Sequence, residues 1–288
     1  MTTGTATPPP FGGLLRTWRQ TRRISQLELS SVSGVSSRHL SFIETGRSRP
    51  SRGMVLRLAE ELGVPLRERN TLLQAAGYAP EYGETSLDAP EMAMVTEALD
   101  TVLGGHLPYP ALVFDSRWAL VRGNAATGIF TDGLPAHLTG PGANTMRITL
   151  HPEGLAPRLL DHATIRSRML RRIRRQAAAT GDPEIVALAE ECAAYPHPGE
   201  PAALDGQAGL AGSPGPTGGR PVDPDIVMPF RLRCAAEEGA GEAEDRVLSM
   251  FSAIATFGTA TDLTVAELSI ETFFPADAST AEFFAKRG

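Results

Sequence analysis

Residues 36–45 carry side chains whose types suit contact with base edges in DNA. On a helix of about 100° per residue, Leu40, Ile43 and Glu44 share one side, and the other side presents Ser37, Arg38, Ser41, Phe42 and Thr45. An arginine can bond both acceptors of a guanine edge, and an aromatic ring can contact a thymine methyl. The pattern therefore predicts a helix in the major groove, although Arg38 and Phe42 would also be ordinary on any helix surface.

Polar residues on both flanks of this segment suit phosphate contacts. Gln26 stands at the start of the preceding helix, where backbone N–H groups favour an anion, and three arginines follow the segment. The predicted DNA contacts are Gln26, Ser36, Ser37, Arg38, Ser41, Phe42, Thr45, Arg47, Arg49 and Arg52.

Short helices must position these residues. Ser25 followed by Glu28 is a capping box, and Gly34 and Gly46 suit left-handed helix ends. Ser36 caps the segment between them. Helical spacing before and after this pair of helices completes five helices, so residues 11–80 are predicted to form one all-α domain.

Charge divides the chain of 288 residues, in which 42% are hydrophobic and the net charge is −6. Residues 1–80 hold eleven arginines against five glutamates, a net charge of +6, while the remainder carries −12. A basic head on an acidic body indicates that only the head meets polyanions. Chance clustering is the alternative. The length suffices for two domains.

The sequence contains few of the motifs that indicate a catalytic site or a metal site. Cys192 and Cys234 lie outside any CxxC spacing, the six histidines show no paired ligand spacing, and GxSxG is absent. We therefore expect no enzyme, no metal site and no disulfide framework, while a bound haem or flavin stays open. No signal peptide and no apolar run of about 18 residues is found, so a cytoplasmic protein without membrane contact is expected.

The rest of the chain reads as helices and strands in turn. Residues 1–10 are a polar tail, residues 81–89 a linker, and residues 198–224 a flexible Gly/Pro-rich loop. Helices are predicted over residues 90–103, 157–179 and 183–194, with Asn124 capping another that runs to Phe130. Strands are predicted in ALVFD and WALVR around a turn at Asp115, and then as a closing meander over residues 226–234, 247–257 and 264–274.

Two resemblances follow from particular motifs. Residues 11–77 resemble the helix-turn-helix domain of the Xre family, with the lambda-repressor-like fold, through Arg19, Ser25-Gln26, Gly34-Val35-Ser36, Ile43-Glu44, Gly46 and Pro50-Ser51. This resemblance implies a buried ion pair between Arg19 and Glu44. The body resembles the MmyB-like regulators through LPYPALVFDSRW, FGTATDLTVAEL and ETFFPAD. That family implies an α+β PAS-like ligand-binding domain with an antiparallel sheet, here residues 90–288.

The implied ligand is a fatty acid or another small apolar molecule. A curved sheet with helices on one face leaves an apolar space, and the predicted lining residues are Trp118, Asn124, Phe130, Met146, Phe230, Phe251, Phe257 and Phe273. The alternative for each is a place in the core, and for Asn124 it is a helix cap. Six arginines between residues 166 and 175 form either a solvated face or a second anion-binding surface.

Together these observations predict a transcription regulator that binds operator DNA as a homodimer and senses a small apolar or amphipathic effector. One recognition helix reads few base pairs, which favours two copies on a two-fold symmetric site. The rival hypothesis is an antitoxin or scaffold whose body binds a protein partner.

Overall fold

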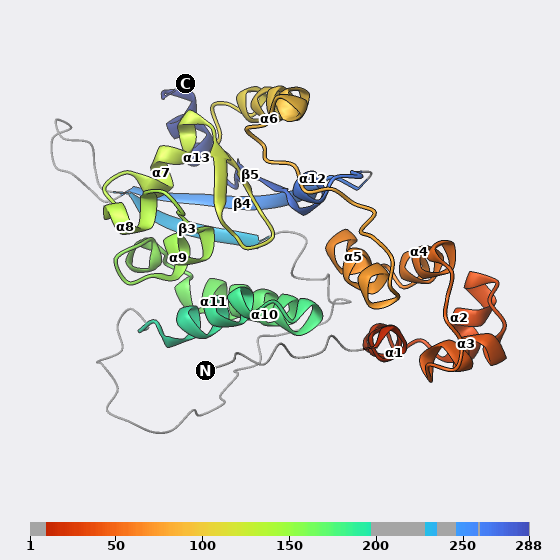
Figure 1. The fold of residues 1–288 in the computed structure, drawn as a ribbon. Coiled ribbons are helices and arrows are strands. Elements are labelled where there is room, and N and C mark those ends of the chain that lie inside the picture. The colour runs from red at the N-terminus through yellow and green to blue at the C-terminus, as the bar shows by residue number, and fades with distance from the viewer. Residues whose placement is uncertain (1–9, 197–227, 235–245, 259, 288) are drawn as a thin grey trace, which may run out of the picture. The chain divides into compact units, whose positions relative to one another are not determined.

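The computed structural model describes residues 10–196, 228–234, 246–258 and 260–287, which form two compact units (Figure 1). The first unit comprises residues up to Ala89 together with Gly258–Ala266, and the second comprises Pro90–Phe257 and Glu267–Gly288. Residues 1–9 of the predicted tail and the whole predicted loop 198–224 lie outside the described residues.

The first unit has the five helices that the sequence predicts: α1 (Phe11–Thr21), α2 (Gln26–Ser33), α3 (Ser37–Glu44), α4 (Arg52–Glu61) and α5 (Leu66–Ala75). The capping box is present, since the Ser25 hydroxyl accepts from the Glu28 N–H and the Glu28 carboxylate accepts from the Ser25 N–H. Gly34 and Gly46 have φ of 68° and 74°, a left-handed conformation that costs glycine little.

Close backbone packing joins α1 to α3 in the core of this unit. Leu15, Leu40 and Leu58 are fully buried. A Cβ added at Gly12 would lie 2.5 Å from the carbonyl oxygen of Ile43, so only glycine permits this approach. The position of α3 is therefore fixed by backbone contact as well as by side-chain packing.

The predicted linker at residues 81–89 begins as part of the first unit. The Asn70 side chain accepts hydrogen bonds from the N–H groups of Glu81 and Tyr82, at 2.9 and 3.1 Å, and donates to the Tyr82 carbonyl. Arg67 pairs with Glu84 at 2.6 Å. The sequence did not indicate these hydrogen bonds or this ion pair, because the partners lie more than ten positions apart in the chain.

A short helix, α12 (Leu263–Glu267), begins where the sequence predicted the start of the last strand. The Asp262 carboxylate accepts from the Thr264 N–H at 2.9 Å, which favours a helix start, so the prediction of a strand from residue 264 was wrong. The same carboxylate accepts from the Thr85 hydroxyl, and the Leu263 N–H donates to the Gly83 carbonyl, both at 2.8 Å.

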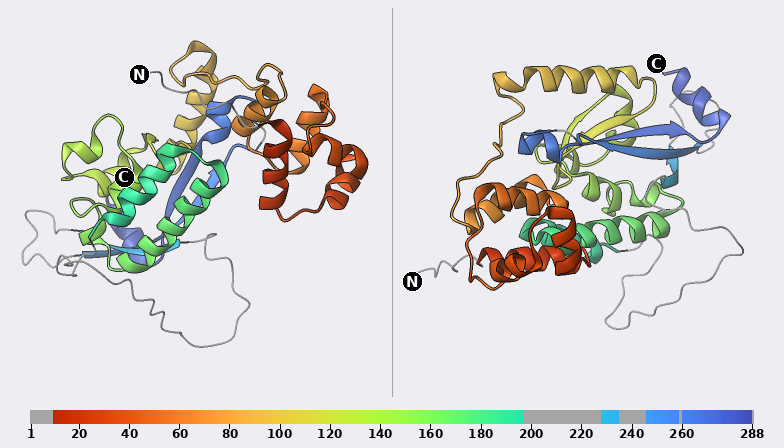
Figure 2. Two further views of the ribbon diagram at one scale, coloured as in Figure 1. Left: turned by 60° about the horizontal axis from the view of Figure 1, so that its bottom comes forward. Right: turned by 90° about the vertical axis from the view of Figure 1, so that its right-hand side faces the viewer.

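The second unit contains one antiparallel sheet with strand order β2-β1-β5-β4-β3 (Figures 1 and 2). Its described strands are β1 (Ala111–Phe114), β2 (Leu120–Gly123), β3 (Met228–Cys234), β4 (Arg246–Thr256) and β5 (Ser269–Pro275). The predicted closing meander is confirmed, because β3 pairs with β4 and β4 with β5.

Helices cover both faces of this sheet, not one face as the sequence suggested. Helix α6 (Ala93–Gly105) lies across one side, and α10 (His162–Thr180) and α11 (Pro183–Ala194) lie on the other (Figure 1). All four residues of β1 are accordingly buried. The remaining elements of this unit are η1 (Pro90–Met92), η2 (Ala125–Thr127), α7 (Gly128–Thr131), α8 (Ala136–Thr139), α9 (Thr145–Leu150), η3 (Ala156–Arg158) and α13 (Ala278–Ala285).

The long helix predicted from residue 157 starts later than expected. Leu159 bridges to Leu232 of β3, and the Leu160 N–H donates to the Arg231 carbonyl at 3.0 Å. This pairing with the sheet holds the chain extended, so α10 begins only at His162.

Candidate nucleic-acid interface and ligand cavity

The polar side of α3 is open, as predicted. We call this surface the reading face, and it consists of Ser37, Arg38, Ser41, Phe42 and Thr45, which are exposed or half-buried. Leu40 and Ile43 on the opposite side are buried at 0% and 1% exposure. The Ser36 hydroxyl accepts from the His39 N–H, so it caps α3. The Arg38 guanidinium lies 5.5 Å from the centre of the Phe42 ring, and the two side chains form one continuous surface.

The predicted ion pair between Arg19 and Glu44 is confirmed, and it anchors the inner side of α3. Nε and Nη2 of Arg19 donate to the two carboxylate oxygens at 2.6 and 2.9 Å. Burial alone would raise the pKa of Glu44, but hydrogen bonds from Arg19 and Gln26 and the charge of Arg19 lower it overall. The Gln26 amide donates to Glu44 at 2.7 Å, so its side chain links α2 to α3. The amide has a second N–H, and the phosphate contact of Gln26 stays a prediction.

Two of the three arginines predicted to contact phosphate already have partners inside the first unit. Arg49 donates through Nε and Nη2 to the Ala76 carbonyl, at 3.2 and 3.0 Å. Arg52 forms an ion pair with Glu81. All three arginines are exposed, and each stays a predicted phosphate contact.

The second unit contains a partly open apolar cavity of about 80 Å³ between the sheet and the helices that cover it. Four of the predicted lining residues, Trp118, Phe130, Phe230 and Phe273, line it. The centre of the Phe130 ring lies 4.7 Å from that of Phe273, and 6.2 Å from that of Phe230. The remaining apolar wall comes from β1, β2, α9 and α10 and from Leu155 and Leu159, which flank η3.

The other four predicted lining residues lie elsewhere. Met146 is fully buried in the core, and Phe251 stacks on Phe274, 5.2 Å between ring centres, on the opposite face of the sheet. Phe257 follows the end of β4 and is half-buried.

Asn124 stands at the N-cap position of η2, but its side chain neither makes a capping hydrogen bond nor lines the cavity. Its Nδ2 donates to the carbonyls of Leu103 and Tyr109, at 3.0 and 2.8 Å, and its Oδ1 accepts from the Ala111 N–H. The Asn124 side-chain amide thus connects the end of α6 to β1 through hydrogen bonds.

Five polar residues of the cavity wall were missed by the sequence analysis: Thr127, Thr131, Thr145, Thr149 and Glu271. The signal for Glu271 was present, because side chains alternate along a strand and Phe273 was predicted to face inward. Burial raises the pKa of the Glu271 carboxyl, against the opposing effects of a hydrogen bond with Ser252 and the charge of Arg172.

Trp118 is held firmly in the cavity wall. Its backbone has φ of 65°, its ring stacks on Phe114 with 5.0 Å between centres, and Nε1 donates to Gln176. The Arg172 guanidinium lies over the Trp118 ring, 4.6 Å from its centre.

The arginine-rich segment of α10 is amphipathic, as its sequence indicates. Ile165, Leu170 and Ile173 are buried. Arg166 donates to the carbonyls of Ala193 and Tyr195, which joins α10 to the end of α11.

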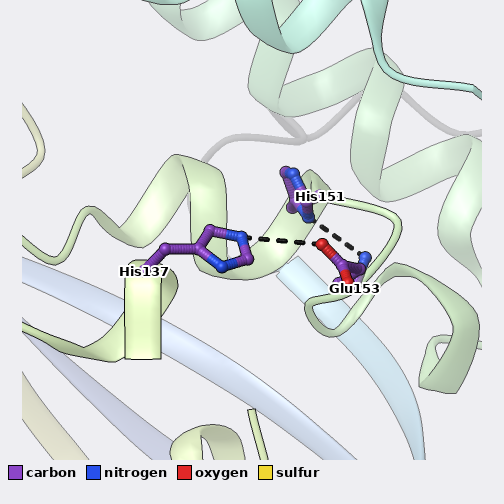
Figure 3. Close-up of side chains that lie close together, drawn as sticks. All are labelled: His137, His151 and Glu153. Carbon is purple, nitrogen blue, oxygen red and sulfur yellow. Dashed lines mark hydrogen bonds and ion pairs between the residues drawn. The ribbon is translucent and has the colours of Figure 1, made fainter. Parts of the chain in front are cut away.

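His137, His151 and Glu153 gather where α8 meets the turn after α9 (Figure 3). His137 Nε2 lies 3.7 Å from a Glu153 carboxylate oxygen. The His151 Nδ1 accepts a hydrogen bond from the Glu153 N–H at 3.1 Å, so the neutral ring carries its proton on Nε2. While this bond is kept, neither nitrogen of His151 offers a free lone pair to a cation, and we assign no metal to the cluster.

Neither cysteine is set up as a nucleophile. Burial raises the pKa of Cys192 to about 12 and also raises that of Cys234. None of the helices in the described part of the chain combines the length and apolar character that crossing a bilayer requires.

Comparisons with known proteins assign a type to each region. Residues 10–72 match the family model of a helix-turn-helix domain, and residues 95–204 match that of the MmyB-like transcription regulator ligand binding domain. An uncharacterized HTH-type transcriptional regulator of Bacillus subtilis (strain 168), RghRB, is 36% identical over 83 residues, which are 28% of this chain and 58% of that protein.

Two solved structures show weaker likeness. The clp gene regulator ClgR from C. glutamicum is 30% identical over 25% of this chain and 96% of its own, with a TM-score of 0.21. An RNA-binding Light-Oxygen-Voltage receptor is 14% identical over 96% of this chain and 62% of its own, with a TM-score of 0.25. TM-scores this low carry nothing about the fold of this chain.

Proposed function

We propose that this chain, which joins a helix-turn-helix domain to the ligand-binding domain of MmyB-like transcription regulators, is a DNA-binding transcriptional regulator that senses a small ligand. The observation that carries the proposal is the open reading face on a helix whose inner side is fixed by the Arg19–Glu44 pair. A rigid helix with an exposed arginine and small neighbours suits the major groove.

The proposed DNA contacts are the reading face and Arg47. Arg38 supplies the bidentate base contact, and Arg47 supplies a phosphate contact that positions the helix. We propose binding as a homodimer to a two-fold symmetric site, because one such helix reads few base pairs.

The proposed effector is a small apolar or amphipathic molecule with a fatty-acid-like chain. The aromatic and aliphatic walls of the cavity support an apolar body. At about 80 Å³ the cavity is smaller than the roughly 150 Å³ that holds a benzene molecule, so a longer chain requires the walls to widen. A ligand that prefers the widened state changes the free energy of DNA binding. That change cannot exceed the difference between the ligand's binding free energies for the two states.

Paired arginine variants test the DNA-binding half. Arg38→Ala should weaken binding to the specific site by about 1–3 kcal/mol and leave binding to unrelated DNA nearly unchanged, measured by fluorescence anisotropy. Arg57→Ala removes the same charge from the exposed side of α4 and is the control. Equal losses from both variants on both DNAs would show that α3 does not read bases.

Footprinting tests the sensing half. Upstream DNA is probed with the full chain before and after lipid extraction, and again after the extract is added back. A footprint that is identical in all three samples contradicts regulation by an apolar ligand.

A further inference from the structure

The cavity wall contains one ionisable group. Glu271 alone is titratable among the described lining residues, and the structure explains why it faces inward. It lies opposite Leu112 of β1 and Ile254 of β4, two positions from the lining residue Phe273 on β5. A strand that buries Phe273 on this face must place Glu271 on the same face.

The protons of the other polar groups of the wall are already engaged. The hydroxyls of Thr127, Thr131, Thr145 and Thr149 each donate to a backbone carbonyl, at 2.6, 3.4, 3.2 and 2.8 Å. The Trp118 Nε1–H donates to Gln176 at 2.9 Å. Since a hydroxyl has a single proton, the threonine oxygens can only accept further hydrogen bonds.

The wall is therefore rich in acceptors and poor in donors. A ligand carboxylate is itself only an acceptor, and it would bring a second acid beside Glu271. Two carboxyl groups in one apolar site cannot readily both ionise, so such a ligand would bind only while one proton is shared between the pair. The charge of Arg172 acts on Glu271, but its guanidinium lies over the Trp118 ring and is not among the lining groups.

We propose that Glu271 anchors the polar end of the ligand, and that the cavity takes an apolar chain with a hydrogen-bond-donating head group, a hydroxyl or a protonated amine, in preference to a free carboxylate. This inference rests on the proposed sensing function and names the ligand class of that same cavity. Such a head group meets Glu271 and the threonine oxygens as acceptors, and leaves no buried donor unpaired.

Three ligands of equal chain length test the inference: n-octanol, octylamine and octanoate, titrated by calorimetry into the lipid-extracted full chain. We expect octylamine and n-octanol to bind at least about tenfold more tightly than octanoate, a difference of about 1.4 kcal/mol. Glu271→Gln should weaken octylamine about tenfold or more and strengthen octanoate, because the amide supplies an N–H donor. Glu282→Gln, an exposed glutamate of α13, is the matched control and should change none of the three.

The outcomes separate this inference from the proposed function. Octanoate binding as tightly as the other two, no binding by any of the three, or equal changes for all three in Glu271→Gln would overturn the inference. The order in the unmutated chain decides the matter even where Glu271→Gln does not fold. If the predicted order holds but no ligand alters the DNA footprint, sensing fails and the head-group preference stands. If octanoate alone alters the footprint, sensing stands and the preference fails.

Discussion

Glu44→Gln tests whether charge pairing holds the DNA-binding helix in place. In the unmutated protein Glu44 accepts two hydrogen bonds from Arg19 and one from Gln26. The side chains of Arg19 and Glu44 are only 11% and 3% exposed. Removing the charge of Glu44 therefore leaves the charge of Arg19 unpaired and with little access to water. Breaking a buried pair costs about 3–5 kcal/mol, but glutamine keeps one acceptor and Arg19 keeps its bond to the Ile24 carbonyl. We expect a loss of about 2–3 kcal/mol.

Urea unfolding of the first unit measures this loss. The chain has two tryptophans, one in each unit, so a Trp118→Phe background leaves Trp18 to report on the first unit alone. Glu60→Gln, on the exposed side of α4, is the control and should change the free energy of unfolding by less than about 0.5 kcal/mol.

Acid dependence supplies a second readout. The pKa of Glu44 is lowered in the folded state, so its contribution is fully present above the ordinary pKa of glutamate and is lost as the pH falls through the lowered value. The difference in the free energy of unfolding between the Glu44→Gln variant and the unmutated protein should therefore become smaller as the pH falls. A deficit below about 0.5 kcal/mol, or one that does not change with pH in this range, would refute the argument.

Three further changes have sharp expectations. Gly12→Ala should cost the first unit about 1–3 kcal/mol because its Cβ would lie 2.5 Å from a carbonyl oxygen of α3, whereas Gly13→Ala, with its nearest atom at 4.0 Å, should leave the melting temperature unchanged or higher. Asn124→Ala should lower the free energy of unfolding of the second unit by about 2–3 kcal/mol, since it removes three hydrogen bonds, and a loss below about 0.5 kcal/mol would contradict the structural role. Cys192, whose pKa is raised to about 12, should resist iodoacetamide at about pH 8 until urea unfolds the chain, and rapid labelling of the native protein would contradict its burial.

Local patterns predicted the helical domain well. The capping box at Ser25, the buried side of α3 and the left-handed glycines each depend on residues within a few positions of one another. Arg49 shows where such reasoning ends. Its acceptor is the Ala76 carbonyl, 27 positions away, and nothing in the sequence near Arg49 indicates that its charge is already engaged.

The ligand cavity was predictable only in part, for a related reason. Alternation along a strand places Phe273 and Glu271 on one face, and the same rule applied to β4 would have placed Phe251 on the other. Whether an inward residue lines a space or fills a core depends on strand register and on the helix opposite. Met146 and Phe130 are both large apolar residues that the sequence predicts to line the cavity, yet only Phe130 borders it.

The first unit is assembled from two stretches of chain, because residues 258–266 pack with residues that precede them by more than 170 positions. A ribosome must therefore synthesise most of the protein before this unit is whole. A fragment that stops at residue 89 would likewise leave Gly83 and Thr85 without their bonds to Leu263 and Asp262. We expect such a fragment to be less stable than the first unit of the full chain, and a synthetic peptide spanning residues 258–266 should restore part of that stability.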